Sequence, residues 1–157
     1  ELGIDLIEIS GGNYEAPVFG GEYENGASFA SYATVLIELT DTPIVSTGGF
    51  RTRKEMENVI SSGVSMIGLA RPFVLYPDLA RRFENNDNFN IKTPRLSTKI
   101  QKLDKALGPI IGVSYYEAQM KRLANNKITK PNTNAWPYLI STIKVHGLSA
   151  LKPRRTK

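Results

Sequence analysis

The sequence predicts an α/β fold with parallel strands, followed by a helical C-terminal part. Short β-branched apolar runs alternate with helical patterns over residues 4–83, and the connections between them are short. Such alternation implies parallel strands joined by right-handed crossovers. From Glu84 the sequence becomes polar and then shows helical patterns only. We therefore predict two parts of one domain, β/α units over residues 1–83 and a helical extension over residues 84–157.

The strands and helices of the first part follow from local signals. Three short runs have the composition of strands and stop at glycine or before proline: Ile4–Ile9, Ile44–Thr47 and Ser65–Leu69. Residues 27–39 form the first predicted helix, with one buried stripe at helical spacing: Phe29, Tyr32, Ala33, Leu36 and Ile37. The second helix has a capping box at Thr52 and Glu55 and a terminal glycine at Gly63. A short helix is expected from Pro77 to Phe83.

Two or three helices are expected after a polar loop at residues 84–94. Ile100, Leu103 and Leu107 have helical spacing and indicate the first. Ser114 and Glu117 form a second capping-box pattern, which predicts a new helix running to about Asn125. The last helix is expected to begin near Asn134 and Pro137 and to end near Gly147.

Composition and charge exclude several functional classes. The sequence has no cysteine and one histidine, which excludes disulfides and thiolate zinc sites, and we expect no metal site. No apolar stretch reaches the roughly 20 residues of a membrane helix, so we expect a cytoplasmic protein without a membrane partner. The net charge is +5, yet residues 1–83 carry 6 basic and 11 acidic residues, against 14 and 4 in residues 84–157.

The basic second part can be interpreted in two ways. It can form a nucleic-acid surface, or it can be the lysine-rich outer face of peripheral helices. The basic residues form no dense run and no motif with interleaved aromatic residues, which favours the second interpretation. We expect no nucleic-acid partner, and a basic nucleic-acid-binding module remains an alternative function.

Two loops that follow neighbouring strands carry the chemical signal. The first contains Gly48 and Gly49 directly before a capped helix, where close backbone approach and helix N–H groups favour a phosphate. The second contains Ala70 and Arg71, and a guanidinium matches two phosphate oxygens. Adjacent parallel strands bring both loops to one edge of the sheet, which predicts a phosphate site. The alternative is a plain glycine turn and an Arg71 paired with a carboxylate.

The order of these motifs resembles the NADH:flavin oxidoreductases of the Old Yellow Enzyme group. Residues 3–15 (GIDLIEISGGNYE) resemble the sixth-strand signature of that family. Residues 43–51 (PIVSTGGFR) resemble its seventh strand and phosphate loop, and residues 66–73 (MIGLARPF) with 77–79 resemble its eighth strand. Residues 115–123 are similar to a C-terminal helix of many members. The resemblance extends to about residue 127 and implies strands 6–8 of a (β/α)₈ TIM barrel plus C-terminal helices.

The resemblance implies a flavoprotein oxidoreductase that holds FMN, is reduced by NAD(P)H and is reoxidised by a small-molecule electron acceptor such as an activated alkene. It assigns the FMN phosphate to Gly48, Gly49, Ala70 and Arg71. The family usually has glycine where this chain has Ala70, and alanine fits there if its φ is negative. Another phosphate-binding TIM-barrel enzyme remains an alternative.

The resemblance also implies what this chain lacks. In the family, the residues that contact the flavin ring and the acceptor come from earlier strands, so we assign no catalytic residue and expect no ene-reductase activity from this chain alone. The chain opens at Glu1, with a predicted strand directly after it, and we expect a fragment. Three barrel strands with open edges should self-associate.

Other candidate residues have structural explanations. We expect Glu8 to form an ion pair, and Tyr14 and Phe19 to pack on a barrel rim rather than line a substrate pocket. His146 is expected to lie at a helix C-terminus. Trp136 beside a proline is typical of a packed helix start.

Overall fold

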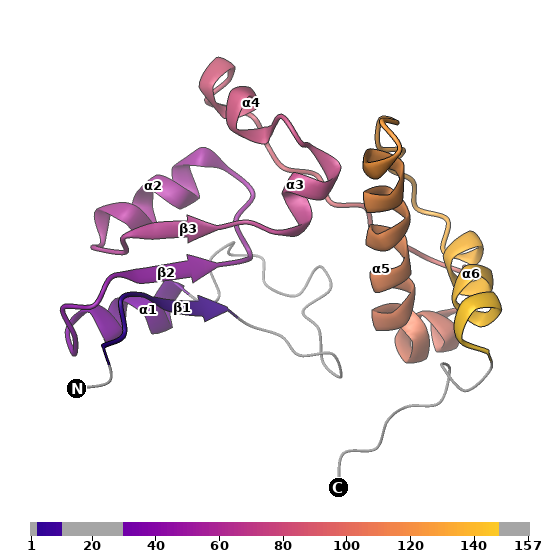
Figure 1. Ribbon diagram of the computed structural model, residues 1–157, viewed down its shortest axis with the longest axis horizontal. Helices are drawn as coiled ribbons and strands as arrows, with labels where there is room; N and C mark the ends of the chain where they lie inside the picture. Colours follow the sequence, from indigo (N-terminus) through magenta and orange to yellow (C-terminus); the bar gives the residue numbers. More distant parts are fainter. Residues whose placement is uncertain (1–2, 11–29, 148–157) are drawn as a thin grey trace, which may run out of the picture. The chain divides into compact units, whose positions relative to one another are not determined.

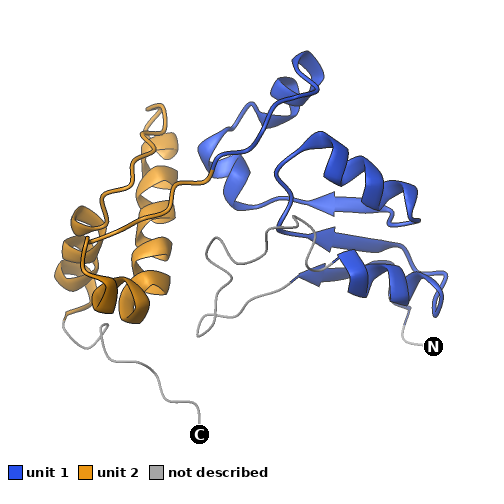
Figure 2. Cartoon of the chain, turned by 180° about the vertical axis from the view of Figure 1, so that it is seen from behind, with its two compact units in different colours: residues 1–11, 21–92 blue, residues 12–20, 93–157 orange. Residues whose placement is uncertain are grey.

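The computed structural model describes residues 3–10 and 30–147. The chain divides into two compact units, which are coloured separately in Figure 2. Unit 1 comprises residues 1–11 and 21–92, and unit 2 comprises residues 12–20 and 93–157. The predicted division of one domain between residues 83 and 84 stays a prediction.

Unit 1 contains a sheet of three parallel strands in the order in which they occur in the chain (Figure 1). The strands are β1 (Ile7–Ser10), β2 (Ile44–Thr47) and β3 (Met66–Gly68). Helix α1 (Ala30–Ile37) connects the first pair and α2 (Arg53–Ser61) connects the second. The predicted α/β class with parallel strands is therefore confirmed.

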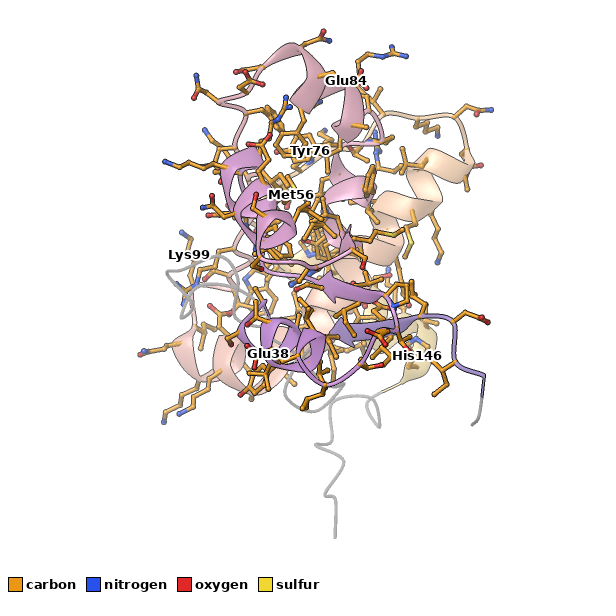
Figure 3. All side chains as sticks on the ribbon, turned by 90° about the vertical axis from the view of Figure 1, so that its left-hand side faces the viewer. Glu38, Met56, Tyr76, Glu84, Lys99 and His146 are labelled. Carbon is orange, nitrogen blue, oxygen red and sulfur yellow. The ribbon has the colours of Figure 1, made fainter. Side chains whose placement is uncertain are left out.

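The two faces of this sheet differ in what covers them. On one face Ile44 packs with Ala33 of α1 and Val59 of α2 in the core of unit 1. Met56 of α2, which is labelled in Figure 3, packs against the same core. The register aligns Glu8, Val45 and Met66 across the other face. There Met66 is 56% exposed. Glu8 on the same face is also exposed, whereas Val45 between them is buried.

The two helices agree with the sequence to different degrees. At α2 the hydroxyl of Thr52 accepts from the Glu55 N–H, the Glu55 carboxylate accepts from the Thr52 N–H, and Gly63 follows with a φ of +104°. The predicted capping box and terminal glycine are thus confirmed. At α1 the predicted buried stripe is wrong for Tyr32, which is 65% exposed, while Ala33 is fully buried. Phe29 lies outside the described residues.

The segment after β3 contains a helix that the sequence pattern did not predict. Helix α3 (Arg71–Leu75) begins directly at the point where proline was expected only to break the strand. Pro72 fits because the first turn of a helix needs no N–H donor. Helix α4 (Leu79–Asn85) follows close to the predicted position. After α4 the chain returns to the start of α2, where the Ile91 N–H donates to the Arg51 carbonyl at 2.8 Å.

Unit 2 is built on α5 (Gln101–Ala124) and α6 (Trp136–His146). The predicted helix start at Ser114 is wrong, because α5 is continuous through this position. The Ser114 hydroxyl instead forms a hydrogen bond with the Thr142 hydroxyl of α6. Pro109 also lies within α5. A proline in a helix crowds the Cβ of the residue before it, and Gly108 has none, which reduces the clash.

The Asp104 carboxylate of α5 forms hydrogen bonds with Ser97 and Thr98, in the segment directly before this helix. Asp104 accepts hydrogen bonds from the Ser97 hydroxyl at 2.6 Å, the Thr98 N–H at 2.7 Å and the Thr98 hydroxyl at 2.6 Å. These donors stabilise the ionised carboxylate and lower the pKa of Asp104 from its ordinary value. The Trp136 indole N–H donates to the Thr98 carbonyl at 3.0 Å, which ties α6 to the same segment.

Candidate anion-binding site

The loop after β2 is shaped by its two glycines. Gly48 and Gly49 have φ values of +94° and +88°, a region that side chains rarely adopt. A Cβ built on Gly48 would meet no atom within 4 Å, so the space above this residue is open. The Gly48 N–H donates to the Gly68 carbonyl at 3.0 Å. This bond assigns the Gly48 N–H to the sheet, and the predicted role of Gly48 in phosphate binding stays a prediction.

The next two amides in the loop belong to Gly49, which is half-buried, and to Phe50, which is fully buried. Among the residues that the structure describes, the N–H groups of Gly49 and Phe50 have no acceptor. The Phe50 side chain is fully buried in the core of unit 1, which fixes the position of its backbone. Phe50 was not among the predicted site residues. Its position directly after two glycines was the available signal, since the turn they make presents the next N–H.

The first N–H groups on the way into α2 are occupied by a side chain. The Glu55 carboxylate oxygen Oε2 accepts from the Arg51 N–H at 2.7 Å and from the Thr52 N–H at 3.1 Å. The Glu55 N–H in turn donates to Thr52 Oγ1 at 3.3 Å. The N–H groups of these three residues are therefore not available to a phosphate, and the expectation that the helix start offers free N–H groups stays a prediction for the rest of the first turn. The donors that remain in the loop precede the helix.

The second predicted loop leaves the sheet beside the first. Thr47 and Gly68 are register partners, and a Cβ built on Gly68 would lie 1.9 Å from Thr47 Oγ1. Thr47 Oγ1 is buried and has no hydrogen-bond partner among the described residues. Such an atom needs a partner, and a ligand at the end of the strand can supply one. The loop after β2 thus begins with a hydroxyl and continues with two amides that have no hydrogen-bond partner in the described part of the chain.

Ala70 and Arg71 stand at the start of α3. Ala70 has a φ of −102°, a region open to any residue, so alanine in place of the family's glycine causes no backbone strain. Arg71 is the first residue of the helix and is half-buried. The hydrogen bond between the Gly48 N–H and the Gly68 carbonyl brings both loops to the same edge of the sheet. Their assignment to a phosphate stays a prediction.

The remaining candidate residues add no second site. Glu8 is exposed and forms no ion pair with any described residue, so its predicted pairing is not found there. His146 is the last residue of α6, as predicted, and Trp136 begins that helix. Tyr14 and Phe19 lie outside the described residues. Within residues 3–10 and 30–147 no three potential metal ligands cluster, and no helix is long and apolar enough to cross a membrane.

Comparisons with known proteins support the sequence resemblance. No protein-family model matches the chain. The chain is 37% identical over 91 residues to the NADH-dependent flavin oxidoreductase iliE of Hypocrea jecorina (strain QM6a), which covers 50% of this chain and 23% of that protein. It is also 37% identical over 102 residues to another NADH-dependent flavin oxidoreductase, iccE of Talaromyces variabilis. That match covers 57% of this chain and 25% of iccE. A third relative, the NADH-dependent flavin oxidoreductase iliE of Neonectria sp. (strain DH2), is 30% identical over 96 residues. That match covers 52% of this chain and 12% of the relative.

These matches define how far the relationship extends. The chain is homologous to part of fungal NADH-dependent flavin oxidoreductases of the Old Yellow Enzyme type, and the predicted resemblance is confirmed to that extent. The matched regions span about a quarter or less of each relative. The flavin and NADH named for these relatives belong to the complete proteins.

Proposed function

We propose that this chain supplies the phosphate-binding end of an FMN site in an NAD(P)H-dependent flavin oxidoreductase, and that its strands correspond to strands 6–8 of a (β/α)₈ barrel. Partial homology to NADH-dependent flavin oxidoreductases supports the cofactor. The sheet supports the barrel, because its parallel strands carry helices on one face while Glu8 and Met66 are exposed on the other. The observation that carries the proposal is that the amides of Gly49 and Phe50 have no acceptor among residues 3–10 and 30–147.

The residues at this edge fit a phosphate group. Two consecutive amides, of Gly49 and Phe50, can donate to its oxygens, and the open space above Gly48 allows a ligand to approach the backbone closely. The orphaned hydroxyl of Thr47 can supply a further hydrogen bond. Arg71 can add a charge-assisted, two-pronged contact from the neighbouring loop. The proposed binding set is therefore Gly48, Gly49, Ala70 and Arg71, as expected from the resemblance, with Phe50 and Thr47 added.

The role of this chain in catalysis is to bind and orient. Held at this site, FMN would supply the hydride-transfer chemistry between NAD(P)H and a small-molecule acceptor such as an activated alkene. No residue of this chain is assigned to proton transfer or to acceptor binding. We therefore propose that the 157-residue chain alone has no ene-reductase activity and that the remainder of the protein supplies the catalytic groups.

The proposal is tested by flavin binding to the complete protein that contains this chain. We expect Arg71→Ala to weaken FMN binding by roughly 10- to 100-fold, as loss of a hydrogen bond to a charged group typically does. Arg95→Ala, which removes an exposed arginine of unit 2, is the matched control and should leave the affinity unchanged. Quenching of flavin fluorescence during titration gives both dissociation constants.

The same titration distinguishes the alternative enzyme. Any phosphate ligand can use these strand-end groups, so a different phosphate-binding barrel would share the site without the flavin. A colourless purified protein, whose Arg71 variant loses affinity for inorganic phosphate, would favour that alternative. Equal FMN affinity in wild type and Arg71→Ala would show that the site assignment is wrong.

A further inference from the structure

The Glu55 side chain makes more contacts than a helix cap requires. In a capping box the carboxylate accepts one N–H, that of the capping residue, here Thr52. Glu55 Oε2 also accepts the Arg51 N–H, and this bond is the shorter of the two at 2.7 Å against 3.1 Å. The extra bond reaches out of the helix into the glycine loop. It ends on the residue directly after the two amides that have no acceptor.

Backbone hydrogen bonds consequently fix the loop on both sides of Gly49 and Phe50. On the strand side, the Gly48 N–H is held by the Gly68 carbonyl at 3.0 Å. On the helix side, the Arg51 N–H is held by Glu55, and the Arg51 carbonyl accepts the Ile91 N–H at 2.8 Å. Between these points lie Gly49 and Phe50. Glycine has the greatest backbone freedom of any residue, so the direction of the Gly49 and Phe50 N–H groups depends on these outer bonds together with the buried Phe50 side chain.

We infer that Glu55 is a positioning residue for the proposed phosphate site. It holds Arg51 so that the peptide N–H groups of Gly49 and Phe50 face a ligand before the ligand arrives. Preorganised donors bind an anion without the free-energy cost of ordering the loop. This inference rests on the proposed function, and Glu55 itself is not expected to touch the phosphate, because both groups carry negative charge.

Variants of the capping box separate this role from ordinary helix stabilisation. Glu55→Ala removes both loop bonds and one half of the box. Glu55→Gln keeps an oxygen acceptor in the same place without the charge. Thr52→Val removes the hydroxyl that accepts the Glu55 N–H at 3.3 Å but leaves both N–H groups that Glu55 holds. Thr52→Val is therefore the matched control, since it weakens the same helix end without releasing the loop.

The experiment measures FMN affinity and thermal unfolding of the three variants in the complete protein. We expect Glu55→Ala to weaken FMN binding by about tenfold or more, since two preorganised hydrogen bonds to a charged group depend on it. Glu55→Gln should restore the affinity, and Thr52→Val should bind as the wild type does despite a lower unfolding temperature. Amide hydrogen exchange in the absence of FMN should be faster at Gly49 and Phe50 in Glu55→Ala than in Thr52→Val.

Each alternative outcome overturns a defined statement. If wild-type protein binds FMN and Glu55→Ala binds it equally well, the positioning role is wrong and the proposed function stands. The same holds if Thr52→Val loses as much affinity as Glu55→Ala, because helix stability then explains both. If the wild type does not bind FMN, the proposed function and this inference fail together.

Discussion

Gly68→Ala is the substitution whose effect the structure defines most directly. A methyl group at this position would lie 1.9 Å from Thr47 Oγ1 and 2.8 Å from Thr47 Cβ. Rotation of the Thr47 side chain can move the hydroxyl, but the Cβ is fixed to the backbone of β2. Because overpacking of this kind typically costs about 1–3 kcal/mol, we expect Gly68→Ala to destabilise unit 1 by that amount.

A double-mutant cycle isolates the contact. Thr47→Ala alone should be nearly neutral for stability, because it removes a buried hydroxyl that has no partner among the described residues. In the Thr47→Ala background, Gly68→Ala should lower the free energy of unfolding by less, because the 1.9 Å contact with Oγ1 is gone. It should still lower it, because the 2.8 Å contact with the Cβ of residue 47 stays. Urea unfolding followed by circular dichroism, with the m-value checked for constancy, gives the four free energies. Equal stability of Gly68→Ala and wild type would refute the described packing of the two strand ends.

Two further predictions concern pH and association. The pKa of Asp104 is lowered in the folded chain by the Ser97 and Thr98 donors, so its contribution to stability is present above the ordinary value of 3.8 and is lost as the pH falls through the folded pKa. Fluorescence of Trp136, the single tryptophan, should therefore report easier unfolding of unit 2 in acid, and Asp104→Asn should reduce that pH dependence. We also propose that the 157-residue chain self-associates, because Leu6 and Met66 are 48% and 56% exposed on unit 1. Sedimentation should then give a mass that rises with concentration, whereas a single monomeric species at every concentration would contradict it.

Local signals in the sequence predicted the local parts of the structure. Helix α2 begins and ends as expected because its cap residues act within four positions of one another. The pattern at Ser114 and Glu117 has the same form and failed. The Ser114 hydroxyl is bonded to Thr142, which lies 28 residues away in sequence, and α5 is continuous through this position. A capping pattern therefore predicts a helix start only where tertiary contacts do not use the same side chain.

The candidate site shows the same limit. The sequence predicted glycines and an arginine at neighbouring strand ends, because both follow from strand order and loop composition. It could not predict that the Gly68 carbonyl would accept the Gly48 N–H and so use that amide within the sheet. That bond depends on how β2 and β3 align, and no local pattern encodes that alignment.

The alignment of β2 and β3 is therefore the determinant of the proposed site. The Gly48 to Gly68 hydrogen bond directly follows the Thr47–Gly68 register pair, so the two loops leave the sheet at the same level. A slip of one residue would move Thr47 to the helix-covered face and place a side chain where Gly68 now accommodates Thr47. It would also release the Gly48 N–H and separate the amide donors from the arginine loop. The proposed anion site therefore depends on the strand register, and Gly68 keeps that register sterically possible.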